Sequence, residues 1–309
     1  MRPYSRVYAT VNLDAVASNM KSMRENLPAS TLIMGSVKAD GYGHGSVPIA
    51  KTIEPYVFGY AVATIDEGII LRRHGINKTI LILGVTHESQ YEELLRYDIR
   101  TAMFQYEKAK KLSDLAVKQG KKAVVHLALD TGMSRIGMKA DREHAKEAAS
   151  IAALEGIEVE GLFTHFARAD ETDKSAYEEQ YRRYKEFLGY LEKLGVQIPI
   201  RHCSNSAGIV ESLESNHMDM VRAGIAIYGM YPSDEVDHNS VKLTPAMEIK
   251  SCITYIKEIG AGTAVSYGGT FVADHTMKVA TIPVGYGDGY VRSLSGKGDV
   301  LIRGKRAAI

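Results

Sequence analysis

Short apolar runs alternate with amphipathic segments along the first three quarters of the chain. Residues 31–37 are mostly apolar and β-branched at both ends, which is typical of a buried strand. A helix is predicted before this strand, because apolar residues recur at spacings of three and four after a capping Asn12 or Asp14. The apolar residues of that helix are Leu13, Val16, Met20, Met23 and Leu27.

The same alternation repeats and predicts eight strands, each followed by a helical segment. Alternating βα units indicate a parallel sheet, and eight of them favour a closed (β/α)₈ barrel of the TIM type, with an open doubly wound sheet as the alternative. The strands are predicted near Thr31, Tyr56, Thr79, Ile99, Ala123, Val159, Ile198 and Met218. Helices are predicted for residues 65–74, 89–97, 106–119, 142–154, 174–194 and 206–213.

The pattern changes near Val241. Apolar positions alternate in part with Lys and Glu, and short runs are separated by Gly and Ser, which predicts a mostly antiparallel β-domain. The polar residues 232–242 are the expected connection. We therefore predict an α/β chain with a barrel at 1–236 and a β-domain at 237–309. Residues 306–309 resemble a strand still in progress, so we expect this β-domain to be truncated.

The composition is that of an ordinary globular protein, with 45% hydrophobic and 24% charged residues among 309. The net charge of +1 suggests neither a nucleic-acid partner nor a membrane surface. Two distant cysteines, Cys203 and Cys252, favour a reducing compartment, and the chain starts without a signal-like apolar run. These features predict a cytoplasmic protein. The scattered histidines predict no metal site.

Lys38 lies where the first strand ends and a glycine-rich turn begins, in Val37-Lys38-Ala39-Asp40-Gly41-Tyr42-Gly43-His44-Gly45. Most lysines are solvated surface charges, and a glycine run by itself indicates only a turn. A lysine fixed at a strand end is nevertheless a candidate Schiff-base nucleophile. The glycines allow the backbone to pass close to a ligand.

Other polar residues follow the later strands, and in a (β/α)₈ barrel such positions share one rim. Each has an ordinary structural interpretation as a surface charge, a buried histidine, a helix cap or an ion-pair partner. Their convergence favours a functional site. Gly224 adds a glycine at a helix start, which is a natural phosphate cradle. The residues at the later strand ends are Arg135, His165, Asn205, Ser206 and Arg222.

The stretch around Lys38 resembles the pyridoxal-phosphate attachment motif of bacterial alanine racemases of fold type III. The resemblance covers nearly the whole chain, and its motifs occur in the family's order. The further motifs are residues 130–137, 164–167, 205–207, 222–229, 265–268 and 283–289. The resemblance implies a pyridoxal 5'-phosphate enzyme that interconverts L-alanine and D-alanine by a two-base mechanism and supplies D-alanine for peptidoglycan.

The resemblance also implies roles for individual residues. Lys38 would carry the cofactor and act as one acid–base group. Tyr267 would be the second, contributed by the partner subunit of a head-to-tail homodimer with shared active sites. Arg222 would face the pyridine nitrogen, with His165 hydrogen-bonded nearby. The other cofactor-binding residues would be Tyr42, Asn205, Ser206, Gly224 and Ile225, and those at the substrate would be Arg135 and Tyr286.

The chain departs from the family pattern in two places. Many members have a modified lysine near the motif arginine, where this chain has Ala128, so Arg135 must be held in another way. The family also continues past Ile309 with a Cys-Met-Asp segment and a phosphate-binding tyrosine. From this we expect the 309 residues alone to bind cofactor with little turnover.

Alternative functions remain at this stage. A single-barrel protein that binds pyridoxal phosphate without turnover would not need a β-domain carrying Tyr267. A decarboxylase of basic amino acids would need an acidic group where Arg222 is expected. The sequence leaves alanine and serine open as the racemase substrate.

Overall fold

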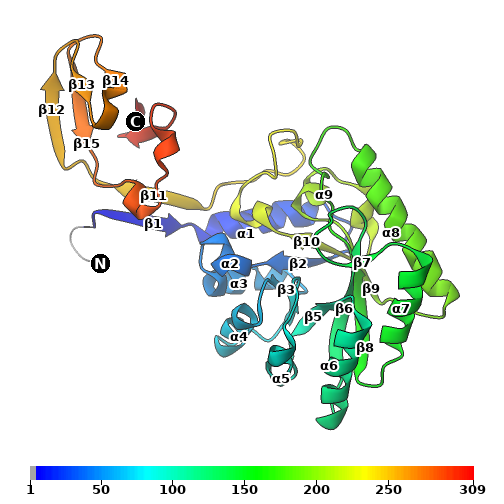
Figure 1. Ribbon diagram of the computed structural model, residues 1–309. Helices are drawn as coiled ribbons and strands as arrows, with labels where there is room; N and C mark the ends of the chain where they lie inside the picture. The colour runs from blue at the N-terminus through cyan, green and yellow to red at the C-terminus, as the bar shows by residue number, and fades with distance from the viewer. Residues whose placement is uncertain (1–4) are drawn as a thin grey trace. The chain divides into compact units, whose positions relative to one another are not determined.

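The computed structural model describes residues 5–309, and its largest feature is a closed ring of eight parallel strands (Figure 1). Strand β2 pairs with β3 on one side and with β10 on the other, and the pairing of β5 with β6 closes the ring. The predicted (β/α)₈ barrel is thus confirmed. In order around the ring the strands are β2 (Leu32–Ser36), β3 (Gly59–Val62), β4 (Thr79–Ile82), β5 (Arg100–Met103), β6 (Ala123–Asp130), β8 (Ile157–Phe163), β9 (Ile200–His202) and β10 (Met220–Ala223).

Helices lie outside this ring, and several begin at a residue whose side chain accepts one of the first helix N–H groups (Figure 1). The Asn12 side chain accepts the N–H groups of Asp14 and Ala15, so Asn12 is the cap of the two candidates, Asn12 and Asp14. Between residues 5 and 309, no helix has the length and apolar character needed to cross a membrane. The helices are α1 (Leu13–Glu25), α3 (Ser46–Ile53), α4 (Ile65–Arg73), α5 (Tyr91–Arg96), α6 (Tyr106–Lys118), α7 (Arg142–Ala152), α8 (Ser175–Lys193) and α9 (Ser206–Val210).

The two faces of β2 show which side chains enter the barrel. A Cβ atom on Gly35 would lie 2.5 Å from the Cδ1 atom of Ile53, so this position faces helix α3. Its neighbours therefore face inward, because side chains alternate along a strand. Met34 packs inside with Ala61 and Leu81. Ser36 shares this inward face at the carboxyl end of the strand.

A second compact unit contains only antiparallel strand pairs, as predicted. It combines the segment ending at Val11 with Met247–Ile309. Its pairs are β1 (Val7–Val11) with β11 (Met247–Ser251), β12 (Tyr255–Ile259) with β15 (Met277–Thr281), β13 (Ala264–Val265) with β14 (Phe271–Val272), and β16 (Asp299–Ile302) with β17 (Lys305–Ala308).

The division of the chain differs from the one placed after residue 236. Residues 237–246 remain with the barrel, where the Thr244 N–H donates to the Asn19 side chain at 2.7 Å and the Ser240 hydroxyl donates to the carbonyl of Val210. Strand β1 belongs to the other unit because its backbone pairs with β11. A local pattern of apolar residues does not reveal such a distant partner.

Candidate active site

Lys38 leaves the carboxyl end of β2 in a turn, α2 (Lys38–Tyr42), that is left-handed. The φ angles are 51° at Ala39, 50° at Asp40 and 53° at Tyr42, and the intervening Gly41 has φ 63°. A left-handed backbone costs roughly 1–2 kcal/mol for each residue with a side chain. The predicted glycine-rich turn is present, but three of its left-handed residues are not glycines. The surrounding structure must therefore stabilise this conformation.

Two carboxylates stabilise the turn. The Glu67 side chain, at the start of α4, accepts the N–H of Ala39 at 2.7 Å and the N–H of Ala63, also at 2.7 Å. Asp40 accepts the N–H of Ser46 at 2.7 Å and so begins helix α3. Glu67 therefore ties the residue after Lys38 to the end of the neighbouring strand. We infer that this clamp fixes the direction in which the lysine leaves the barrel.

Arg222, near the end of β10, is 4% exposed, and its guanidinium donates to several acceptors. It donates to the carbonyls of Thr164 at 2.6 Å, Cys203 at 2.9 Å and His202 at 3.1 Å. The Nδ1 atoms of His202 and His165 lie at 2.8 Å and 3.3 Å. No carboxylate of the described residues is among its partners. Burial lowers the pKa of Arg222 to about 10, so the side chain remains a cation at neutral pH.

His165 follows β8 and faces the Arg222 guanidinium. Burial, and then the positive charges of Arg222, Arg135 and Lys38, lower the pKa of His165 to about 3. The imidazole is therefore neutral at physiological pH. An arginine can only donate hydrogen bonds, so we assign Nδ1 of His165 as the acceptor. These charges act on one imidazole, which indicates that Lys38 and Arg135 approach the same rim as Arg222.

The loop after β10 forms a cradle of hydroxyl and N–H groups. The Ser206 hydroxyl oxygen accepts the N–H of Gly224 at 2.9 Å and that of Ala226 at 3.4 Å. A Cβ atom on Gly224 would lie 3.4 Å from the Tyr42 hydroxyl and 3.5 Å from the Ser206 hydroxyl. Both hydroxyls thus face the same side of this glycine. The segment from Ile225 is a short 3₁₀ turn, Ile225–Tyr228, instead of a regular helix.

Asn205 has a structural role in addition to its position on the rim. Its side chain caps α9 by accepting the N–H of Gly208 at 3.2 Å. Its amide group also donates to the carbonyl of Phe166 at 3.4 Å. The cap aligns the first turn of α9, and Ser206 is the first residue of that turn.

Arg135 is exposed, in the loop after β6, and has no hydrogen bond or ion pair within residues 5–309. Ala128 packs inside the barrel in an apolar cluster with Ala102 and Phe163. At the position of the family's modified lysine, this protein therefore has Ala128, which makes only apolar contacts in this cluster. The described residues provide no anion that fixes Arg135.

Tyr267 and Tyr286 belong to the β-strand unit and are 85% and 73% exposed. Each begins a short 3₁₀ turn, Tyr267–Gly269 and Tyr286–Asp288. The second turn is anchored by Asp288, which accepts the N–H of Gly285 at 3.1 Å and forms an ion pair with Arg6. Both phenol rings are therefore presented to solvent on ordered turns.

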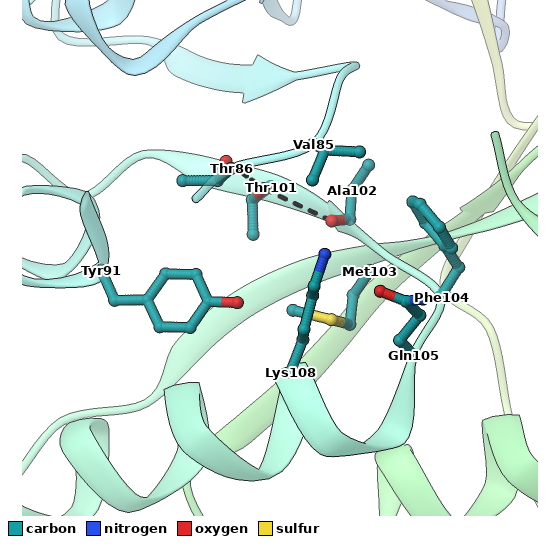
Figure 2. A pocket seen from close by; sticks show the side chains of 9 residues that line it. All are labelled: Val85, Thr86, Tyr91, Thr101, Ala102, Met103, Phe104, Gln105 and Lys108. Carbon is teal, nitrogen blue, oxygen red and sulfur yellow. Dashed lines mark hydrogen bonds between the residues drawn. The ribbon is translucent and has the colours of Figure 1, made fainter. Parts of the chain in front are cut away.

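A small pocket elsewhere in the barrel is a different site (Figure 2). It lies between the end of β5 and helices α5 and α6, and the Lys108 ammonium and the Tyr91 hydroxyl face its interior. Its cavity volume is about 10 Å³, which is about the room that one water molecule requires. It is too small for an organic substrate and shares no residue with the rim around Lys38.

Several residues that position the groups on the rim were not predicted from the sequence. His202 and the carbonyl of Thr164 hold Arg222, and Glu67 holds the turn after Lys38. The ring of Tyr228 packs on Tyr42 with 5.0 Å between the ring centroids, and its hydroxyl donates to the carbonyl of Ser36. Residues 164 and 228 lie within the motifs, but nothing in the motifs shows that they position other groups.

Comparison with known proteins agrees with this arrangement. The family model described as alanine racemase, N-terminal domain, matches residues 11–232, and the one described as alanine racemase, C-terminal domain, matches residues 246–309. An alanine racemase of Desulforamulus reducens is 43% identical over 304 residues, which are 98% of this chain and 82% of that protein. One from Clostridium perfringens strain SM101 is 44% identical over 304 residues, covering 98% of this chain and 78% of that protein.

A solved structure shows the same similarity in three dimensions. The alanine racemase of Clostridium difficile 630 superposes with a TM-score of 0.92 at 39% identity, covering 99% of this chain and 80% of that chain. The likeness thus includes the barrel and the β-strand unit. On these matches, the chain belongs to the alanine racemase family.

Proposed function

We propose that this protein is a cytoplasmic amino-acid racemase that interconverts L-alanine and D-alanine with pyridoxal 5'-phosphate, and that it supplies D-alanine for peptidoglycan. The observation that carries the proposal is the buried Arg222 cation, which has no carboxylate partner among the described residues and lies on the same rim as Lys38. The free cysteines Cys203 and Cys252 fit a reducing compartment.

The rim residues fit the proposed cofactor. The Tyr42 and Ser206 hydroxyls, beside Gly224, form an anion cradle suited to a phosphate, and the N–H groups of Gly224 and Ala226 orient the Ser206 hydroxyl. The buried Ser36 hydroxyl faces the barrel interior without a hydrogen-bond partner in the described chain, so a polar ligand can use it. The Lys38 amine would hold the aldehyde carbon covalently. Asn205 and the first backbone N–H of the 3₁₀ turn, at Ile225, would complete the site.

Arg222 determines which reactions the site favours. When bound, pyridoxal phosphate withdraws electrons from an attached amino acid and makes its α-hydrogen acidic. A guanidinium donates hydrogen bonds and does not give up its proton at neutral pH, so a ring nitrogen held at Arg222 would remain unprotonated. Electron withdrawal is then weaker than with an acidic partner. Arg222 thereby favours proton transfer over decarboxylation or transamination.

Racemisation needs a proton acceptor on one face of the α-carbon and a proton donor on the other. We propose Lys38 for one face and Tyr267 of the partner subunit in a head-to-tail homodimer for the other. The 85% exposure of Tyr267 leaves its hydroxyl accessible to a second copy. Arg135 and Tyr286 would contact the substrate or the groups around it. Arg135, exposed and without an anion partner, is suited to a substrate carboxylate.

The proposed reaction is tested with the 309 residues extended by the later segment of the family, incubated with pyridoxal phosphate and L-alanine in deuterated water. We expect deuterium at the α-carbon and appearance of D-alanine, with slower exchange of L-serine run in parallel. Cofactor binding without exchange of either amino acid would contradict the proposal and favour a carrier without turnover. Faster exchange of serine would overturn the choice of alanine.

Replacing Gly224 by alanine should weaken cofactor binding selectively. The added methyl group would occupy the cradle beside the Tyr42 and Ser206 hydroxyls, where the phosphate is proposed to bind. Loss of one or two charge-assisted hydrogen bonds predicts roughly a tenfold to hundredfold weaker affinity. Fluorescence titration with pyridoxal phosphate measures this change.

The matched control is Gly189→Ala on α8, where an added Cβ atom has no neighbour within 4 Å. Thermal unfolding without cofactor should be similar for the two variants. Equal cofactor affinity for both would show that the phosphate does not bind at Gly224.

A further inference from the structure

A buried chain of side chains leads from Arg222 toward the amino ends of the barrel strands. Arg222 lies 2.8 Å from Nδ1 of His202, and Nε2 of His202 lies 2.8 Å from Nδ1 of His126. Nε2 of His126 lies 2.9 Å from a carboxylate oxygen of Glu160. Arg100, the first residue of β5, donates to the same oxygen at 3.4 Å. The two imidazoles are fully buried.

Arg222 determines which atom donates and which accepts in each of these hydrogen bonds. Arg222 can only donate, so Nδ1 of His202 is an acceptor and its proton lies on Nε2. That proton is donated to Nδ1 of His126, which places the proton of His126 on Nε2. The last proton points to Glu160, which is an acceptor when ionised. Burial lowers the pKa of both histidines, which keeps them neutral as this direction requires.

The backbone has two local features that accommodate these buried side chains. Val125 pairs with Val159 but His126 pairs with Gly161, so Glu160 is the additional residue of a β-bulge. Bulges redirect side chains, and here the bulge residue is the one whose carboxylate contacts His126. A Cβ atom on Gly161 would lie only 2.4 Å from Nδ1 of His126. The bulge thus directs the Glu160 carboxylate to His126, and Gly161 leaves space for the His126 ring.

The hydrogen bonds through His202 and His126 connect Arg222 to the carboxylate of Glu160. Burial raises the pKa of Glu160, but the hydrogen bond from His126 and the positive charge of Arg100 outweigh it, and the pKa is lowered overall. The carboxylate is therefore ionised at neutral pH. Its charge makes Nδ1 of His126, and through it Nδ1 of His202, a stronger acceptor, because hydrogen bonds in a chain polarise one another.

We propose that Glu160, His126 and His202 form a polarisation relay that orients Arg222 and stabilises its charge from inside the barrel. All three are positioning residues, and no proton leaves its nitrogen. The relay and the other partners of Arg222 together use its Nη1 and Nη2 groups, so the Nε–H of Arg222 is the guanidinium donor with no partner among the described residues. The relay's link to catalysis rests on the proposed function, in which Arg222 faces the cofactor ring.

The relay is tested first by nitrogen-15 NMR of the histidines in the protein without cofactor. We expect His126 and His202 to be neutral with the proton on Nε2 from about pH 6 to about pH 9. A proton on Nδ1 of His202, or a charged imidazole in this range, would overturn the proposal. This measurement requires no variant and no activity.

The second test compares Glu160→Gln with Glu158→Gln. Glu158 lies on the same strand but is exposed. Glutamine keeps an acceptor for His126 and removes only the charge. We expect the Arg222 side-chain N–H protons of Glu160→Gln to exchange with solvent about tenfold faster, in line with one weakened charge-assisted hydrogen bond. Unchanged exchange in a folded Glu160→Gln protein would overturn the relay.

Activity of the loaded protein gives a third comparison. Glu160→Gln should lower kcat about tenfold with little change in KM for alanine, whereas Glu158→Gln should resemble the unaltered protein. A rise in KM alone would contradict a positioning role. Absence of racemisation in the unaltered protein would overturn the proposed function and leave the NMR results of the relay standing.

Discussion

Lys38→Ala is expected to abolish racemisation and the visible absorption of bound pyridoxal phosphate. Lys38 is the amine at the end of β2, on the rim that carries Arg222 and the Gly224 cradle. Alanine removes both the covalent attachment and one of the two acid–base groups. Because general acid–base catalysis alone contributes typically 10²–10⁴-fold, the loss should exceed this range. Absorption spectra and the exchange assay in deuterated water measure both effects.

Lys51→Ala is the matched control, since Lys51 is an exposed lysine on the neighbouring helix α3. Borohydride reduction followed by peptide mapping should label residue 38 in this control and no peptide in Lys38→Ala. A label on another lysine of the unaltered protein would show that the attachment site is assigned incorrectly.

Tyr267→Phe should separate the two directions of the reaction. The variant keeps the ring but removes the hydroxyl that is proposed to act from the partner subunit. Because the residue is 85% exposed, the fold should tolerate the change. Exchange of the α-hydrogen should slow by roughly 10²–10⁴-fold for one enantiomer and far less for the other. Deuterium incorporation into L-alanine and D-alanine, measured separately, gives the two rates.

Tyr255→Phe is a suitable control, because Tyr255 is 59% exposed on β12 of the same unit. It should leave both exchange rates and cofactor binding unchanged. Equal slowing for the two enantiomers in Tyr267→Phe would contradict the two-base assignment.

The barrel was predictable because its signal is local. Each strand is a short apolar run and each helix has an apolar stripe, so the eight units are visible one at a time. Lys38, His165 and Arg222 were also predictable as rim residues, because the carboxyl ends of parallel strands meet on one rim. The helix-cap alternative for Asn205 is confirmed, and it does not exclude a place in the site.

Features that depend on distant partners could not be predicted. The left-handed turn at Ala39 is stabilised by Glu67 from the next helix, so glycine content alone did not reveal it. His126 and His202 are unremarkable in the sequence, and they acquire a role only when β6 and β9 bring them together. The segment after Gly224 is a 3₁₀ turn that ends after four residues at Gly229, where φ is 83°.

The discontinuous β-strand unit has a consequence during synthesis on the ribosome. Strand β1 is translated first, but its partner β11 follows only after the entire barrel segment. At roughly 5–20 residues per second, this delay is on the order of tens of seconds. During that interval the barrel segment can fold, while the backbone edges of β1 lack their native partner and can pair with other nascent chains. Correct pairing of β1 therefore requires this strand to avoid other partners until β11 has been synthesised.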